Sequence, residues 1–334
     1  MPDCLLNLIP AAAVTILAFA VARAKRAPLW AEAFRRLRRN RLARGALAVM
    51  CLYGMVGFLD SLSWRDAQAA PKRTVIDRLF QRSPERTYSA PLATETTGEP
   101  VSHPLQGKHV LGTDGVGEDT LYLTLKGCRT ALIIGGLTSL IVTPLALLFG
   151  MLAGYFGKRV DDAVQYVYTV LDSMPWILLL IALLMVMGRG LVQLCIALGI
   201  TSWVGLCRLA RGETLKHRDR DYVRAARALG LGHGRILLCH ILPNLLPVVI
   251  ISVTLGFSEL VLSEAVLTYL QLGVQAGVGS WGNMIDAARM ELAREPVIWW
   301  NLLSASTALF ILVLAFNVFG DALRDAIDPR LRSS

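Results

Sequence analysis

The sequence predicts an all-α protein that crosses a membrane several times. Several apolar runs approach or exceed the roughly 20 residues that a helix needs to cross a bilayer. The chain as a whole is 54% apolar and only 18% charged, with a mean hydropathy of +0.51. Arginine and lysine gather in the segments beside the apolar runs, which is the charge pattern typical of cytoplasmic loops.

The first apolar run lies at the N-terminus. Residues 5–21 are about one turn short of a comfortable span, and basic residues follow them instead of preceding them. That order disfavours a cleaved signal peptide. We predict an extra N-terminal helix within 1–22, with its N-terminus outside, and an interfacial anchor is the alternative.

A basic segment follows over residues 23–44. Its pattern predicts a helix that lies along the cytoplasmic membrane surface, with arginines toward lipid phosphates. Phe34, Leu37 and Leu42 are expected to face lipid. Residues 45–62 then form the first predicted core span.

Residues 63–129 differ from the rest of the chain. They are polar, mixed in charge and rich in Pro, Thr and Ser, without a sustained apolar period. We predict an extracytoplasmic loop, partly irregular. Near its end, Asp114 suits a turn that caps a following helix. The Gly/Asp cluster around it lacks the alternating ligands and closing glutamate of a calcium loop, so we expect no metal site.

Residues 130–320 are predicted to form the remaining membrane core. Its expected spans lie at 130–154, 172–187, 191–209, 245–270 and 297–319. A short charged turn at 155–162 and a glycine-rich turn at 188–190 join the first three, and 321–334 is predicted as a cytoplasmic tail.

Other functions are disfavoured by the same patterns. The net charge of +9 reflects residues that flank apolar spans, so no nucleic-acid partner is expected. The six cysteines are scattered without a C-x-x-C pair and read as small buried hydrophobes. The glycines at 230–234 have the wrong spacing for a dinucleotide fingerprint, and no Walker motif is present. We therefore expect no catalytic site on this chain.

The stretch from 221 to 247 is basic and glycine-punctuated, although it lies between two apolar spans. A short helix is predicted, with arginines on one side and a small apolar face made of Val223, Ala225, Ala226 and Leu229 on the other. Gly230 fits its C-terminus, because a residue without Cβ enters the left-handed region cheaply.

A second short helix is predicted to begin near His233 and to yield at Leu242-Pro243, because proline breaks the helical hydrogen-bond ladder. Arginine and lysine outnumber acidic residues over 208–240, which places this loop on the cytoplasmic side. Two short helices joined at a glycine suit a docking element, and an ordinary surface helix is the alternative.

These residues resemble a known motif. Ala225-Ala226, Gly230 and Leu242-Pro243, in that order, are similar to the EAA loop of ABC importer permeases, and the run from His240 to Asn244 resembles the dipeptide, oligopeptide and nickel branch. In that family the loop is a coupling helix that docks in a groove of a cytoplasmic ATPase. The family's leading acidic residue is replaced by arginine here.

The resemblance implies that loop 211–243 couples this chain to an ATPase. The implied coupling residues are Tyr222, Arg224, Ala225, Ala226, Leu229, Gly230, His240, Leu242 and Pro243.

Four further stretches carry the resemblance. They are Leu111-Gly112-Thr113-Asp114, the Glu-Ala-x-Leu-x-x-Leu-x-Leu-Gly pattern from Glu264 to Gly273, Ser280-Trp281-Gly282, and a C-terminal signature from Asn317 to Arg330. Together they imply six core transmembrane helices of the ABC importer permease type. Trp281 also suits the membrane interface.

Two glutamates lie within the predicted span 245–270. Ionisable groups at membrane depth are costly, so they face a bundle interior or an aqueous path. For Glu264 we favour a structural carboxylate, and for Glu259 structural pairing and lining of the translocation path stay open. Both are candidate translocation-path residues.

The resemblance implies a multi-pass protein of the bacterial inner membrane. The implied partners are a second permease subunit, two cytoplasmic ATPase subunits that bind ATP and Mg²⁺, an extracytoplasmic substrate-binding protein and membrane lipid. The implied cargo is a dipeptide or oligopeptide, with nickel or another small solute as the alternative. An ion-driven secondary transporter, which usually shows broken helices in repeated halves, and a membrane scaffold are the other classes considered.

Overall fold

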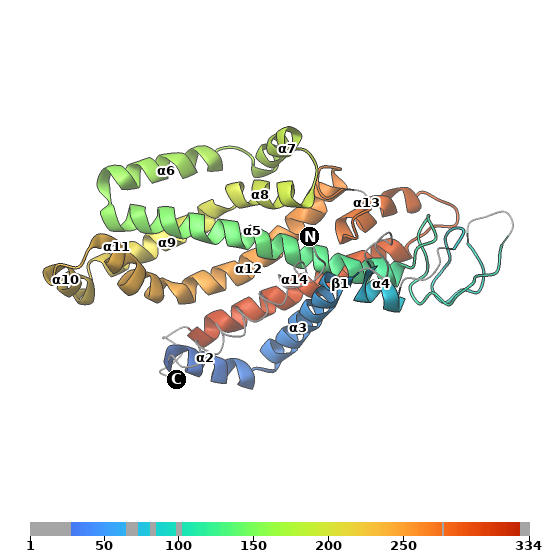
Figure 1. Ribbon diagram of the computed structural model, residues 1–334, viewed down its shortest axis with the longest axis horizontal. Helices are drawn as coiled ribbons and strands as arrows, with labels where there is room; N and C mark the ends of the chain where they lie inside the picture. Colours follow the sequence, from blue (N-terminus) through green and yellow to red (C-terminus); the bar gives the residue numbers. More distant parts are fainter. Residues whose placement is uncertain (1–27, 65–72, 81–84, 98–101, 276, 328–334) are drawn as a thin grey trace. The chain divides into compact units, whose positions relative to one another are not determined.

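The computed structural model describes residues 28–64, 73–80, 85–97, 102–275 and 277–327 (Figure 1). The helix expected within 1–22 lies outside them. Most of the described residues are helical, which confirms the predicted all-α class. The helices are α2 (Pro28–Arg39), α3 (Arg41–Ser61), α4 (Val75–Phe80), α5 (Thr120–Phe156), α6 (Lys158–Asp172), α7 (Trp176–Met187), α8 (Leu191–Thr201), α9 (Trp203–Arg218), α10 (Asp221–Ala228), α11 (His233–Ile236), the π-helix η1 (Leu237–Ile241), α12 (Leu242–Tyr269), α13 (Trp281–Glu291) and α14 (Trp300–Ile327). The short strands β1 (Ser63–Trp64) and β2 (Arg73–Thr74) pair antiparallel.

Among the described residues, five helical segments are long and apolar enough to cross a membrane. They are Arg41–Ser61, Thr120–Phe156, Leu191–Arg218, His233–Tyr269 and Trp300–Ile327. A sixth results if α6 and α7, which are bent by 86° at the break between them, count as one span. The protein is therefore a multi-pass membrane protein, and the count of six core spans stays a prediction.

The structure divides the predicted outer loop differently. The span expected at 130–154 begins earlier, as α5 at Thr120, because Asp119 caps that helix. The Asp119 carboxylate accepts from the backbone N–H groups of Leu121 at 2.8 Å and Tyr122 at 3.4 Å. Asp114, expected to cap the helix, instead closes the preceding turn, where it accepts from the N–H groups of residues 116 and 118 at 3.0 and 2.8 Å.

Two other boundaries also shift. The charged turn predicted at 155–162 is confined to Gly157, which has a φ of +65°, and α6 starts at the next residue. The chain bends later, at Pro175, because proline lacks an N–H and disfavours the helical conformation of the residue before it. At the C-terminus, α14 runs to Ile327, so the tail predicted from 321 begins as a continuation of the last span.

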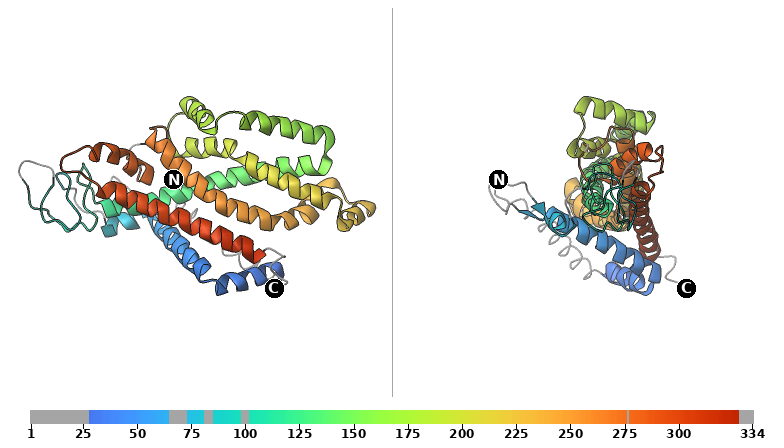
Figure 2. Two further views of the ribbon diagram at one scale, coloured as in Figure 1. Left: turned by 180° about the vertical axis from the view of Figure 1, so that it is seen from behind. Right: turned by 90° about the vertical axis from the view of Figure 1, so that its right-hand side faces the viewer.

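The chain forms two compact units, one made of residues 1–133 and 261–334 and the other of 134–260. In the first unit, α14 packs along α3 and contacts α2 (Figure 2). Leu37 of α2 is buried, so the prediction that it faces lipid is wrong, whereas Leu42 is 73% exposed.

The second unit is built on the C-terminal half of α5. Buried residues of α5, α6 and α9 form one of its cores, namely Val142, Ala146, Ala153, Val164, Tyr168, Trp203, Val204, Leu206 and Cys207. A bidentate ion pair also joins α9 to α6, because Arg211 donates to both oxygens of Asp161 at 2.5 and 2.7 Å. This framework positions the end of α5 beside the loop that follows α9.

Candidate functional site

The stretch between α9 and α12 folds as helix, glycine joint and helix, at one end of the second unit (Figure 1). Gly230 adopts a φ of +76° after α10. Its N–H donates to the Arg227 carbonyl at 2.9 Å, and the Leu231 N–H donates to the Ala226 carbonyl at 3.1 Å. This pair of bonds is the Schellman motif of helix C-termini. The predicted glycine cap and the start of the second helix at His233 are both confirmed.

One side of this loop is buried. Val223 and Ala226 of α10 are 0% and 4% exposed. They share a core with residues of α5, α9, α11, η1 and α12, namely Met151, Tyr155, Ala210, Ile236, Leu237, Ile241, Leu245 and Val249. Leu231 and Leu242 pack against its edge. Both short helices are therefore fixed to the same apolar core as the end of α5.

A polar cluster reinforces this attachment. The Tyr155 hydroxyl, at the end of α5, lies 2.9 Å from His233 Nδ1 and accepts from Arg227 Nε at 3.2 Å. The Arg227 guanidinium also stacks 4.8 Å from the centroid of the Tyr155 ring. These three residues, here called the Tyr155 cluster, join both helices of the loop to α5. The sequence pattern predicted Tyr155 in a turn and gave no sign of this role, because the three residues are far apart in the sequence.

The predicted apolar face of α10 is partly wrong. Val223 and Ala226 are buried, but Ala225 is exposed and Leu229 is 82% exposed. In a helix each residue is rotated by about 100° from the one before, so Ala225 lies about 160° from Val223, and Leu229 stands just past the end of α10. The exposed side of the loop therefore combines small and apolar residues with Arg224.

The expected break at Leu242-Pro243 is also wrong. The Leu242 N–H donates to the carbonyl of Leu237, five residues back, which closes the π-helical turn η1. The carbonyl of His240 accepts from the side-chain amide of Asn244 at 2.7 Å. This wider turn accommodates Pro243, and the helix continues into α12. The second short helix is therefore connected to a membrane span without a break.

The remaining coupling candidates lie around this core. The Tyr222 hydroxyl, on α10, lies 2.8 Å from Nδ1 of His217 on α9. His240 and Leu242 are half-buried, and Pro243 is exposed.

The two glutamates of α12 have different surroundings. Glu259 is exposed on α12. Glu264 is 2% exposed and accepts from the Thr268 hydroxyl at 3.0 Å. A Cβ placed at Gly282 would lie 3.0 Å from a Glu264 oxygen, so the two sequence patterns that contain these residues pack together. This geometry favours the structural interpretation of Glu264, and translocation roles for both residues stay predictions.

The sequence suggested that Trp281 lies at the membrane interface, but the structure buries it inside the protein. It is 1% exposed, and its indole N–H donates to the Thr124 carbonyl of α5 at 2.9 Å. A tryptophan in this position is a core residue with a satisfied donor.

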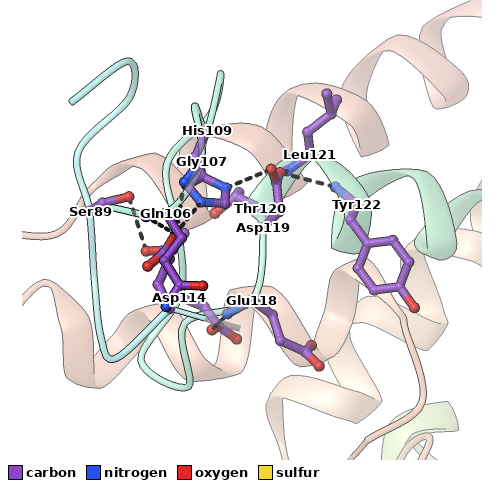
Figure 3. Close-up of polar contacts among 12 residues, drawn as sticks. Ser89, Gln106, Gly107, His109, Asp114, Glu118, Asp119, Thr120, Leu121 and Tyr122 are labelled. Atoms are coloured by element: carbon purple, nitrogen blue, oxygen red, sulfur yellow. Dashed lines mark hydrogen bonds and ion pairs between the residues drawn. The ribbon is translucent and has the colours of Figure 1, made fainter. Parts of the chain in front are cut away.

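A second buried polar site lies in the segment before α5 (Figure 3). His109 is 1% exposed, with Nδ1 lying 2.8 Å from Asp119 and Nε2 lying 3.3 Å from Glu85. The Glu85 oxygen also accepts from the backbone N–H groups of residues 106 and 107 at 2.8 and 3.2 Å. This network ties the segment to the cap of α5, and the sequence, which predicted a partly irregular loop here, gave no sign of it.

Two further carboxylates lie in the same segment. Burial raises the pKa of Asp114, although three backbone N–H groups act in the opposite direction. Burial and the Asp114 charge raise the pKa of Glu118.

Comparison with solved structures shows what the fold is similar to. A chain of the MetNI methionine ABC transporter, in an inward-facing conformation, superposes with a TM-score of 0.50 at 19% identity, covering 63% of this chain and 98% of that one. This likeness shows the fold, which is that of a chain of an ABC transporter.

Sequence comparison then identifies the family. Residues 146–333 match the model described as "Binding-protein-dependent transport system inner membrane component". The chain is 30% identical over 301 residues to the dipeptide transport system permease protein DppC of Bacillus subtilis (strain 168), covering 90% of this chain and 86% of the relative. It is 31% identical over 304 residues to the oligopeptide transport system permease protein OppC of the same organism, covering 91% and 90%. The chain belongs to this family of transport system inner membrane components.

Proposed function

We propose that this chain is one permease subunit of an ATP-driven importer that carries peptides across the bacterial inner membrane. The observation that supports this most directly is the helix–glycine–helix loop, which is packed on α5, is continuous with α12 and has one side exposed. The curated relatives are named for dipeptide and oligopeptide transport, which supports peptides as the cargo of this chain. Nickel or another small solute is the alternative cargo.

The loop is built to transmit movement. The Tyr155 cluster and the shared apolar core hold α10 and α11 to the end of α5, and η1 joins α11 to α12. A displacement of the loop therefore moves the ends of two spans as one body. In the proposed cycle, ATP binding closes a cytoplasmic ATPase dimer and displaces the loop. The spans then rock between inward-open and outward-open arrangements.

The proposal assigns the other tasks to partners. Two ATPase subunits bind ATP and Mg²⁺ and hydrolyse ATP, since this chain carries no Walker motif. A second permease subunit completes the translocation path, and an extracytoplasmic binding protein delivers the substrate.

Purification of this chain from its native membrane in mild detergent tests the proposal. We expect an ATPase, a second permease and a binding protein to co-purify. The reconstituted complex should then import peptides only with ATP, and a parallel assay with nickel identifies the cargo. If the chain purifies without an ATPase under conditions that keep complexes intact, or if an ion gradient alone drives uptake, the proposal fails.

A further inference from the structure

The side of the loop that faces away from the core is positively charged. Residues 216–240 contain six arginines and lysines but only two aspartates. Several of these charges are already used within the chain. Lys216 pairs with Glu213 at 2.5 Å, Arg218 lies 3.6 Å from Asp219, and Arg227 belongs to the Tyr155 cluster.

Three arginines differ from these: Arg220, which is exposed just before α10, and the two that lie on the short helices. Arg224 on α10 and Arg235 on α11 are both exposed. Neither side chain makes a hydrogen bond or ion pair with another residue that the structure describes. They lie on either side of the Gly230 joint, so a partner that covers the joint can reach both of them.

The surface beside Arg224 is small and apolar. Ala225 and Ala228 are exposed and lie three residues apart on one side of α10, which allows another backbone to approach closely. Leu229 projects next to them with 82% of its surface exposed. We use the name α10 face for the exposed surface made of Arg224, Ala225, Ala228 and Leu229, together with Arg235 of the neighbouring helix α11.

We infer that the α10 face binds an acidic groove on the cytoplasmic ATPase, in which carboxylates pair with Arg224 and Arg235 and an apolar pocket receives Leu229. The inference rests on the proposed function and adds the chemistry of the partner's groove. A guanidinium pairs with a carboxylate through two parallel hydrogen bonds, so arginine specifies both the charge and the orientation of its partner. An exposed leucine beside such a pair gains free energy when a partner's pocket removes its side chain from water.

Anionic lipid is the other ligand class that an arginine-rich helix can bind. A helix at a membrane surface presents a broad apolar stripe to the acyl chains. In α10, the apolar residues Val223 and Ala226 are already buried in the protein, so only Leu229 and the small side chains of Ala225 and Ala228 are left for lipid. The α10 face therefore fits a protein groove better than a bilayer.

The test uses the purified complex in nanodiscs of phosphatidylcholine, which carries no net charge. The ATPase that co-purifies with the wild-type chain is removed, purified and added back. We expect Arg224→Glu to weaken its binding about tenfold or more and to reduce the salt dependence of binding. Arg38→Glu makes the same charge change at another exposed arginine, on α2, and should leave binding unchanged.

A second variant guards against a folding defect. Arg235→Glu lies on the other short helix, and its binding should weaken in the same direction, while both variants should elute as the wild type does in size-exclusion chromatography. Unchanged ATPase binding by both variants overturns the inference but leaves the proposed function intact. If the variants bind the ATPase normally and lose activity only in vesicles with phosphatidylglycerol, the ligand is lipid and the inference is overturned. A wild-type chain that binds no ATPase contradicts the proposed function itself.

Discussion

Gly230 and Gly117 have the same backbone conformation in opposite surroundings. Their φ angles are +76° and +82°. A Cβ at Gly230 meets nothing within 4 Å, whereas a Cβ at Gly117 would lie 2.0 Å from the carbonyl oxygen of Glu85. The first glycine only turns the chain between two helices, but the second also lets two backbone segments touch. The difference separates an open joint, suited to a partner, from a closely packed segment that supports α5.

The largest effect is expected for Gly117→Ala. The new methyl group overlaps the Glu85 backbone, whose N–H donates to the Gly117 carbonyl at 2.9 Å. Neither atom belongs to a flexible side chain, so the segment must move. We expect the free energy of unfolding to fall by on the order of 4 kcal/mol. Gly230→Ala is the matched variant and should cost only about 1 kcal/mol, because it adds backbone strain without a clash. The measurement is thermal unfolding of the detergent-solubilised protein. Equal losses of stability in the two variants would mean that the two glycines do not differ in how closely they are packed.

His109→Leu tests the same segment through its charges. The substitution leaves Glu85 and Asp119 buried without the group that joins them. We expect a loss of about 2–3 kcal/mol in the free energy of unfolding, measured by chemical denaturation. His109→Gln keeps a donor and should lose less. An unchanged stability of the leucine variant would show that the network does not support the segment.

The open joint could be predicted from the sequence, and the packed segment could not. Gly230 is recognised because helix ends are local: apolar spacing, a glycine and a restart near His233 lie within one short stretch. The His109 network depends on Glu85 and Asp119, which no periodicity relates to each other. Long-range contacts of this kind leave no local signal, so the segment reads as an irregular loop.

Proline shows the same limit at shorter range. Pro175 lies between α6 and α7, where the sequence prediction began a span at 172 but assigned the first residues of α6, within 155–162, to a turn. Pro243 was expected to end a helix, but η1 widens the turn and the helix continues. The local rule is the same for both residues, and the surrounding hydrogen bonds decide the result. Likewise, the pattern that groups Ala225 with Ala226 does not show which of them the core of α5 covers.

Gly230→Val sharpens the comparison at the open joint. A β-branched residue in the left-handed region is strained by about 1–2 kcal/mol, so the protein should still fold and insert. The joint should change shape, and we expect fewer peptides to be imported per ATP hydrolysed in proteoliposomes. Gly234→Ala, within α11 and with open space at its Cβ, is the control and should keep the wild-type ratio. A normal ratio for Gly230→Val would count against the loop as the coupling element.

Tyr155→Phe removes one hydroxyl from the attachment of the joint to α5. The ring stays, but the contacts to His233 and Arg227 are lost, at a cost of about 1 kcal/mol. We expect ATP hydrolysis to continue while peptide uptake falls, since α10 and α11 are held less firmly to the span. Tyr53→Phe removes a hydroxyl that donates to the Ala308 carbonyl, outside the loop, and serves as the matched control. Parallel losses of hydrolysis and uptake in Tyr155→Phe would contradict a transmitting role.

The smallest effect concerns the packed segment and pH. Burial raises the pKa of Asp114 above its ordinary value of 3.8, so the folded segment favours the protonated carboxyl. Its contribution to stability is fully present below pH 3.8 and is lost as the pH rises through the folded-state pKa. Asp114→Asn keeps an oxygen that accepts the hydrogen bonds of the turn and removes the charge. The substitution also removes the repulsion between Asp114 and the Glu118 carboxylate. At pH 7 the variant should therefore be more stable than the wild type by less than about 1 kcal/mol in the free energy of unfolding, and it should unfold at a higher temperature. This difference in stability between the two proteins should disappear as the pH is lowered. A difference in stability that stays the same from pH 7 down to the acidic end of the titration would mean that the charge of Asp114 does not cause the difference, and that the turn itself prefers asparagine.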